Sequence, residues 1–143
     1  MTDYRLVYYS ENRVPSSQLA AEIETILAAS RRNNVLVGIT GALMFSEGHF
    51  AQVLEGSQAA IESTFERIQQ DRRHGNVNLL EFSSAPTRGF QNWSMAFIGS
   101  SDDVTAEVKD IAIRSGFDPR PLDGGQLFVR LLELLKEPVS RKS

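Results

Sequence analysis

The order of elements predicted from this 143-residue chain indicates an α+β fold: a ferredoxin-like sandwich (βαββαββ) followed by two additional C-terminal helices. Three observations predict it. Two amphipathic helical segments are separated by a pair of strand-like segments, and a short glycine turn joins that pair. Strand–helix–strand crossovers are right-handed, so both helices pack on the same face of one sheet. The length suits one domain with its own core.

The N-terminal third is predicted to form a strand, a helix and a second strand. Residues 5–10 are β-prone and apolar on both faces, which indicates a strand covered on both sides. Apolar spacing predicts a helix over residues 16–31 with a serine N-cap. Asn33 and Asn34 are expected to end it, because asparagine tolerates left-handed backbone. Residues 37–45 form the second predicted strand, and its two glycines indicate close approach of another backbone or a ligand.

The third predicted strand carries an unusual polar residue. After the turn at residues 46–48, Phe50, Gln52 and Leu54 fall on one strand face. A glutamine between two large apolar residues is expected to be buried, where an unpaired amide costs about 1–3 kcal/mol. An amide offers both donors and an acceptor. Gln52 is therefore a candidate for binding a ligand rich in carbonyls and ring nitrogens.

The second half repeats the pattern. A serine-capped helix is predicted over residues 58–70, followed by strands over residues 76–84 and 90–98. The last of these strands would place Trp93 and Met95 on one face. The sequence therefore predicts the second crossover of the sandwich and one further strand.

Two helices are predicted in the C-terminal extension, over residues 101–114 and 126–136. Asp123 and Gln126, three residues apart, resemble a capping box at the start of the second helix. That helix is too apolar to lie alone on the surface. It is expected to cover the open face of the sheet or to pack on another subunit.

Composition excludes several classes of function. A formal net charge of −3 and a pI of about 5.4 argue against nucleic-acid binding. The absence of cysteine excludes disulfides, thiolate metal sites and thiol catalysis, and two histidines far apart in sequence do not suggest zinc. The chain has neither a signal peptide nor an apolar run long enough for a bilayer. We therefore expect a cytoplasmic protein that does not act at a membrane.

Enzyme motifs are missing. The chain has no glycine-rich phosphate loop, no G-x-S-x-G elbow and no H-E-x-x-H pair, so we expect no enzymatic activity. The alternative is a small ferredoxin-like hydrolase of the acylphosphatase type, which would share the sandwich. Such an enzyme needs an anion-binding loop after the first strand, and residues 11–15 lack the glycines of such a loop.

Five motifs occur in a fixed order along the chain. They read Leu6-Val7-Tyr8-x-Ser10, Asn33-Asn34-x-x-x-Gly38-Ile39-Thr40-Gly41, Phe50-x-Gln52-Val53-Leu54-Glu55-Gly56, Ile68-x-x-Asp71-x-Arg73-His74 and Phe90-x-x-Trp93-Ser94-Met95. With these motifs, the stretch from Asp3 to Ser100 resembles the BLUF family of flavin-binding blue-light sensors. The short chain is similar to the stand-alone members of that family.

The resemblance implies a flavin, usually FAD, with FMN or riboflavin as alternatives, held between the two sandwich helices. It divides the chain into a flavin-binding domain, residues 1–100, and a helical extension, residues 101–143. A flavin-free interaction module is a further alternative. The cofactor-binding residues that the resemblance implies are Tyr8, Ile23, Asn33, Asn34, Phe50, Gln52, Arg67, Ile68, Asp71, Arg73 and His74.

The resemblance also implies a photochemical mechanism. Tyr8 would donate an electron and a proton after light absorption, and Gln52 would bridge Tyr8 and the flavin and rearrange its hydrogen bonds. Trp93 or Met95 would lie beside Gln52, and the sequence leaves the choice open. The last strand and the C-terminal helices would carry the signal to a separate partner, of the response-regulator or phosphodiesterase type. A homo-oligomer is expected.

Overall fold

The computed structural model describes residues 3–99, 111–113 and 117–136. Within these ranges the chain forms one six-stranded sheet with the order β4-β1-β3-β2-β5-β6. The elements are β1 (Tyr4–Asn12), α1 (Leu19–Val37), β2 (Thr40–Ser46), β3 (His49–Gly56), α2 (Gln58–Gln70), β4 (His74–Ser84), β5 (Ala96–Gly99), β6 (Ile111–Ile113) and α3 (Gly124–Lys136).

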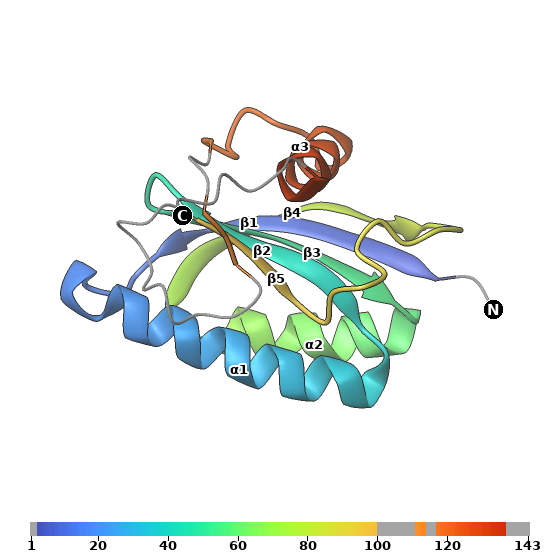
Figure 1. Ribbon diagram of the computed structural model, residues 1–143, viewed down its shortest axis with the longest axis horizontal. Coiled ribbons are helices and arrows are strands. Elements are labelled where there is room, and N and C mark those ends of the chain that lie inside the picture. The colour runs from blue at the N-terminus through green and yellow to red at the C-terminus, as the bar shows by residue number, and fades with distance from the viewer. Residues whose placement is uncertain (1–2, 100–110, 114–116, 137–143) are drawn as a thin grey trace, which may run out of the picture.

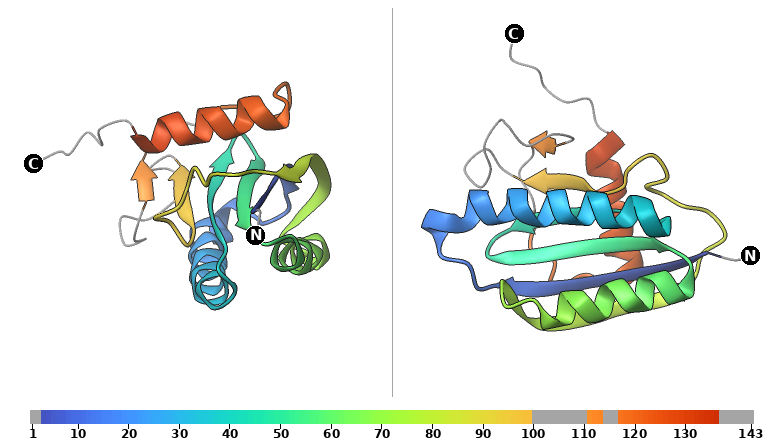
Figure 2. Two further views of the ribbon diagram at one scale, coloured as in Figure 1. Left: turned by 90° about the vertical axis from the view of Figure 1, so that its right-hand side faces the viewer. Right: turned by 90° about the horizontal axis from the view of Figure 1, so that it is seen from below.

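The predicted ferredoxin-like sandwich is confirmed. The strands β4, β1, β3 and β2 pair antiparallel in the order that two right-handed crossovers produce. The strand β5 adds parallel to β2, and β6 adds parallel to β5. Both sandwich helices cover one face of the sheet and α3 covers the other (Figures 1 and 2). The sheet is thus covered on both sides.

Alternation along β1 and β3 separates two apolar cores. Phe50 and Leu54 pack with the cluster beneath α1 and α2, whereas Ala51 and Val53 belong to the cluster beneath α3. The predicted faces of the third strand are therefore confirmed. Gln52 points to the side of the two sandwich helices and is only 4% exposed.

The first helix differs from its prediction at both ends. A short 3₁₀ turn at residues 16–18 precedes it, no side chain caps it, and α1 begins at Leu19. It continues past the two asparagines because the Asn34 side chain is engaged elsewhere, donating to the Ser94 carbonyl at 2.7 Å. Gly38, with φ of 71°, ends the helix in left-handed backbone. The second strand consequently begins at Thr40 rather than at residue 37.

The hairpin and the second helix follow the sequence closely. Glu47 and Gly48 have φ of 50° and 77°, as a tight two-residue turn requires. The Ser57 hydroxyl accepts from the Ala60 N–H at 3.2 Å, and α2 spans the predicted residues 58–70. Gly41 is a close approach, because a Cβ there would lie 1.9 Å from the Val53 carbonyl oxygen. These local signals were sufficient to predict this part of the fold.

The strand predicted over residues 90–98 is wrong in its first half. Only residues 96–99 form β5, because the preceding segment is held as a loop by the buried Glu55. The Glu55 carboxylate accepts from the Gly89 N–H at 2.6 Å and from the Phe90 N–H at 2.9 Å. Trp93 and Met95 therefore do not share a strand face. Met95 packs on the side of α1 and α2, and Trp93 packs on the side of α3.

The predicted helix over residues 101–114 is wrong at its end, since residues 111–113 are the strand β6. The rest of that prediction lies outside the described residues. The predicted last helix is confirmed as α3, and its capping box is present: the Asp123 N–H donates to Gln126 Oε1, and the Gln126 N–H donates to Asp123 Oδ1.

The helix α3 covers the sheet through an apolar and aromatic contact. Leu127 and Leu131 are fully buried in the second core. The Phe128 ring packs edge-on to Phe90 at 5.7 Å, and the Arg5 guanidinium lies 3.7 Å from its centroid. This burial explains the apolar sequence of the helix without a second subunit.

Replacing a buried leucine of α3 tests this packing. Leu131→Ala should lower the free energy of unfolding by about 2–5 kcal/mol, because it opens a cavity under the helix. Val129→Ala, on the exposed side of the same helix, should change it by about 0.5 kcal/mol or less. Denaturant unfolding measures both. Equal, small effects would mean that α3 does not pack on the sheet.

Candidate functional site

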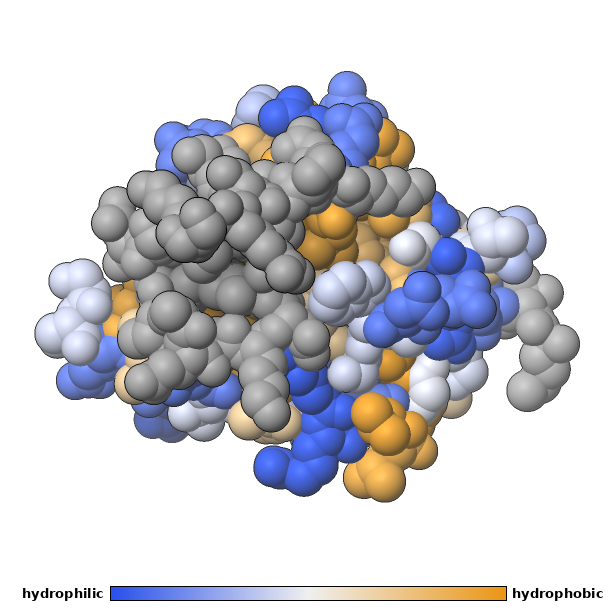
Figure 3. All heavy atoms as spheres, viewed as in Figure 1, coloured by the Kyte–Doolittle hydropathy of each residue, from blue (hydrophilic) through white to orange (hydrophobic). Residues whose placement is uncertain are grey.

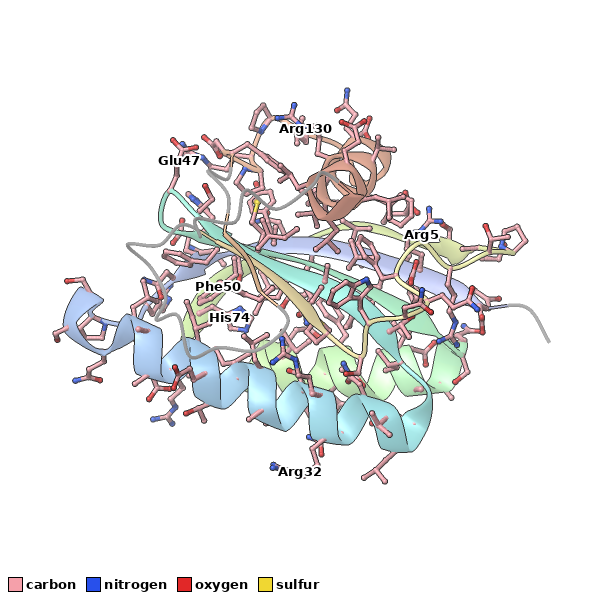
Figure 4. All side chains as sticks on the ribbon, viewed as in Figure 1. Arg5, Arg32, Glu47, Phe50, His74 and Arg130 are labelled. Atoms are coloured by element: carbon pink, nitrogen blue, oxygen red, sulfur yellow. The ribbon has the colours of Figure 1, made fainter. Side chains whose placement is uncertain are left out.

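A cavity of about 410 Å³ lies between α1 and α2, with β1, β3 and β2 as its floor. Figure 4 shows Phe50 and His74 on this side of the sheet, facing the two helices. The lining residues are Tyr8, Ile26, Ala29, Ser30, Asn33, Asn34, Leu43, Phe50, Gln52, Leu54, Thr64, Arg67, Ile68, Gln70, Asp71, Arg73 and His74.

The fold brings together almost all the binding residues expected from the sequence. Every one of them lines the cavity except Ile23, which is fully buried in the core behind it. Of the two remaining photoactive candidates, Met95 contacts Gln52, and Trp93 packs in the core on the opposite face of the sheet. Expected residues from five elements, β1, α1, β3, α2 and β4, thus converge on one cavity.

Tyr8 and Gln52 are direct cross-strand partners in the β1–β3 ladder. Both side chains point into the cavity floor, with exposed fractions of 2% and 4%. The Tyr8 hydroxyl donates a short hydrogen bond to Gln52 Oε1. This pairing satisfies a buried phenol and a buried amide at once, which removes the cost of burying either group alone.

The other end of the Gln52 amide faces Met95. Gln52 Nε2 donates to the Met95 thioether at 3.4 Å. Sulfur is a weak acceptor, and an amide nitrogen has two N–H bonds. Among the described residues, Gln52 therefore links Tyr8 to the segment before β5 and retains donor capacity toward the cavity.

Tyr8 is held neutral by its surroundings. Burial raises the pKa of its phenol above the ordinary value of 10.0, and the negative charge of Asp71 adds to the effect. Its ring packs against Phe65 and His74, with centroids 5.5 and 6.1 Å away. Tyr8 is thus a proton-bearing phenol across the physiological pH range.

A charged cluster closes the C-terminal end of α2. Asp71 receives hydrogen bonds from Arg73 Nε at 2.9 Å and Nη2 at 2.6 Å. Burial acts to raise the pKa of Asp71, but these hydrogen bonds and the Arg73 charge lower it below its ordinary value. Arg73 also reaches Glu22 on α1 at 3.4 Å. The cluster therefore joins the two helices at one end of the cavity.

His74 is fixed between a strand and a helix end. Its Nε2 lies 2.7 Å from the Ile68 carbonyl oxygen and its Nδ1 lies 2.6 Å from the Ser10 hydroxyl. A carbonyl can only accept, so Nε2 carries a proton. The ring therefore ties the end of α2 to β1 beside Tyr8.

Some lining residues were missed from the sequence. The clearest are Ser30 and Thr64, which face each other's helix across the cavity. Ser30 lies on the same face of α1 as Ile23, and Thr64 lies on the same face of α2 as Ile61 and Ile68. Each is a small polar residue on an otherwise apolar helix face. That break in the apolar pattern was the signal available.

The loop after β1 does not form an anion-binding site. The Asn12 N–H donates to the Gly48 carbonyl, the Arg13 N–H to the Arg73 carbonyl, and the Val14 N–H to the Asn12 side chain. These donors are already engaged, so they cannot hold a phosphate as a hydrolase of the acylphosphatase type requires. The described ranges also hold no group of metal-ligating residues, and none of their helices has the length and hydropathy needed to cross a bilayer.

The donor set of the cavity fits a flavin. Its walls are apolar and aromatic, with Phe50, Leu43 and Ile68 available to pack on a flat ring. Asn34 and Gln52 are buried amides that can pair with ring carbonyls and nitrogens. Two cations, Arg67 and Arg73, belong to the same lining and suit an anionic side chain such as a diphosphate.

Comparison with known proteins agrees with this chemistry. The family model described as BLUF, sensors of blue-light using FAD, matches residues 4–96. The blue light- and temperature-regulated antirepressor BluF of Escherichia coli (strain K12) is 30% identical over 113 residues, which are 79% of this chain and 27% of that protein. The photoactivated adenylate cyclase subunit beta of Euglena longa is 31% identical over 91 residues, 63% of this chain and 10% of that protein. The chain thus spans under a third of either relative.

Solved structures of related proteins also match this chain. The structure described as BlsA in its photo-activated state has a TM-score of 0.78 and 31% identity, covering 98% of this chain and 99% of that one. The dark-state structure of the BLUF protein BlrB has a TM-score of 0.66 and 32% identity, covering 71% and 75%. Since the family model matches most of the chain and the fold and cavity agree with it, this chain belongs to the BLUF family, the sensors of blue light using FAD.

Proposed function

We propose that this protein is a blue-light photoreceptor that binds FAD non-covalently between α1 and α2, changes the hydrogen bonds of Gln52 on illumination, and signals to a separate partner without catalysing a reaction itself. One observation carries the proposal: the buried contacts from Tyr8 to Gln52 to Met95 at the floor of the cavity. They form a continuous path from a phenol to the segment that precedes β5.

Different residues of the cavity would contact different parts of the FAD molecule. Asn34 and Asp71 would pair with the polar edge of the ring, and Phe50 and Ile68 would pack on its faces. Arg67, Arg73 and His74 would hold the remaining polar groups, with Asn33 and Ile23 supporting the α1 side. The presence of all of these residues except Ile23 in one cavity, with Ile23 in the core behind it, supports this assignment.

Bound FAD supplies the absorption of blue light and, once excited, a strong one-electron acceptor. Tyr8 is suited to be the electron donor because it is neutral, buried and hydrogen-bonded. A phenol that has lost an electron is a strong acid, and its proton is already directed at Gln52 Oε1. Tyr8 regains both electron and proton afterwards, so there is no net redox change.

Gln52 acts as the switch because its amide has two arrangements. As the structure stands, Oε1 accepts from Tyr8 and Nε2 faces Met95. A rotated or tautomeric amide exchanges donor and acceptor at these two places, and so presents a different hydrogen-bonding pattern to the cavity. A change in hydrogen bonding alone is enough to shift an absorption band slightly to the red.

The path outward begins at Met95, directly before β5. That strand pairs with β2 and β6, and the loop before it contacts α3 through Phe90 and Phe128. We propose that β5 and α3 carry the change to a partner of the response-regulator or phosphodiesterase type, with residues 1–100 as the flavin-binding unit and 101–143 as the extension.

A cytoplasmic location stays a prediction. So does a homo-oligomer, which the exposed Val35 and Leu36 at the end of α1 would favour. Figure 3 shows an apolar patch at the lower right, over that end of the helix.

Visible spectroscopy tests the mechanism. The purified FAD-loaded protein should be yellow and should show a small red shift under blue light that reverses in the dark. Tyr8→Phe and Gln52→Leu should bind FAD without shifting. Tyr9→Phe, which removes the adjacent phenol on the α3 side of the sheet, should keep the shift. A normal photocycle in either of the first two variants would rule the mechanism out.

The raised pKa of Tyr8 predicts that the folded protein loses stability at alkaline pH. The unfolded phenol loses its proton above pH 10 while the folded one keeps it, so the folded state binds more protons there. This residue alone should lower the free energy of unfolding by about 1.4 kcal/mol per pH unit above that value. Denaturant unfolding between pH 9 and pH 11, roughly spanning the ordinary tyrosine pKa, measures the slope. Tyr8→Phe should reduce it, and an unchanged slope would contradict a neutral buried Tyr8.

A further inference from the structure

Three successive backbone carbonyls beside the switch are each held by a donor from another element. The Trp93 carbonyl accepts from the Gly41 N–H of β2 at 3.0 Å. The Ser94 carbonyl accepts from Asn34 Nδ2 at 2.7 Å, and the Met95 carbonyl accepts from Arg31 Nε at 2.9 Å. The segment before β5 is therefore clamped along its backbone, residue by residue.

The two side-chain donors come from the same face of α1. Arg31 and Asn34 are three residues apart, which places them one above the other on the helix. Asn34 lines the cavity, whereas Arg31 does not. Arg31 therefore reaches the backbone of Met95 from outside the flavin site and can be altered without changing the cavity lining.

The clamp fixes the backbone from which the Met95 side chain extends toward Gln52. With its carbonyl fixed to α1, its thioether is held 3.4 Å from Gln52 Nε2. A hydrogen bond from a charged guanidinium is stronger than one between neutral groups. The bond therefore favours the arrangement in which Met95 points at Gln52.

We propose that Arg31 is a positioning residue of the photoswitch. Its bond to the Met95 carbonyl stabilises the arrangement with Met95 against Gln52, weakens when the Gln52 amide changes its pattern, and re-forms during dark recovery. This inference rests on the proposed function, and it adds α1 as a second element that responds to Gln52.

The test compares Arg31→Leu with Arg32→Leu, because leucine removes the guanidinium without adding another labelled methionine. Both remove one arginine of α1, but Arg32 lies on the outer side of the helix, away from the sheet (Figure 4). Both FAD-loaded proteins are prepared with methionine labelled by ¹³C at the backbone carbonyl. A Met44→Leu background removes the labelled methionine of β2. Dark recovery of the visible spectrum, light-minus-dark infrared spectra and the dark ¹³C NMR shift of the Met95 carbonyl are recorded.

In the protein with native Arg31, the Met95 carbonyl should give an infrared band that moves to higher frequency in the light. In Arg31→Leu, FAD binding and the red shift should remain, but that band pair should disappear and the dark NMR shift should change. Recovery should slow by a factor of roughly 5 to 10, as loss of part of a charged hydrogen bond implies. Arg32→Leu should match the native protein in all three measurements.

The inference is overturned if Arg31→Leu recovers at the native or a faster rate. It is also overturned if the Met95 carbonyl band does not move in the native protein. Absence of any red shift in the native protein would instead contradict the proposed function, so the two failures can be told apart.

Discussion

The structure depends on one buried contact, the hydrogen bond between Tyr8 on β1 and Gln52 on β3. Neither group tolerates burial without a partner, and their pairing satisfies both. The pairing requires the register of the β1–β3 ladder, since a slip of one residue would turn Gln52 toward α3. In the proposed mechanism, a cost that would normally exclude glutamine from a core becomes the source of a switch with two hydrogen-bonding arrangements.

The sheet separates this switch from the surface that could report it. Tyr8, Gln52 and Met95 lie on the side of α1 and α2, whereas α3 covers the opposite face (Figure 2). The loop between β4 and β5 connects the two sides. Its beginning is fixed by Glu55 and contacts α3 through Phe90, and its end carries Met95 to Gln52. This loop and the contacts of α1 with its backbone therefore offer one route by which a change in the cavity could reach the opposite face.

Local chemistry explains which parts of the fold the sequence predicted. The faces of β3, the Ser57 cap of α2 and the capping box of α3 depend on neighbours a few residues away, and all were predicted correctly. The ferredoxin-like order follows from handedness alone. Most of the cavity residues were expected from five sequence motifs, although two polar residues on the helix faces, Ser30 and Thr64, were missed.

Apart from the start of α1, the errors involve contacts between distant residues. Asn34 does not end α1 because its side chain bonds to Ser94, sixty residues away. Residues 90–95 are not a strand because Glu55 holds the loop, and residues 111–113 are a strand because β5 offers a free edge. Which of Trp93 and Met95 lies beside Gln52 likewise depends on where that loop turns. Propensity and pattern carry no information on such partners.

The central claim is that the Gln52 amide changes its hydrogen bonds in light. The most direct measurement is a light-minus-dark infrared spectrum of the FAD-loaded protein carrying ¹³C in its glutamine side-chain carbonyls. A reversible band pair from the label should appear, persist in Gln91→Leu and vanish in Gln52→Leu. A protein whose visible spectrum shifts to the red while the labelled carbonyl bands stay unchanged would contradict the account.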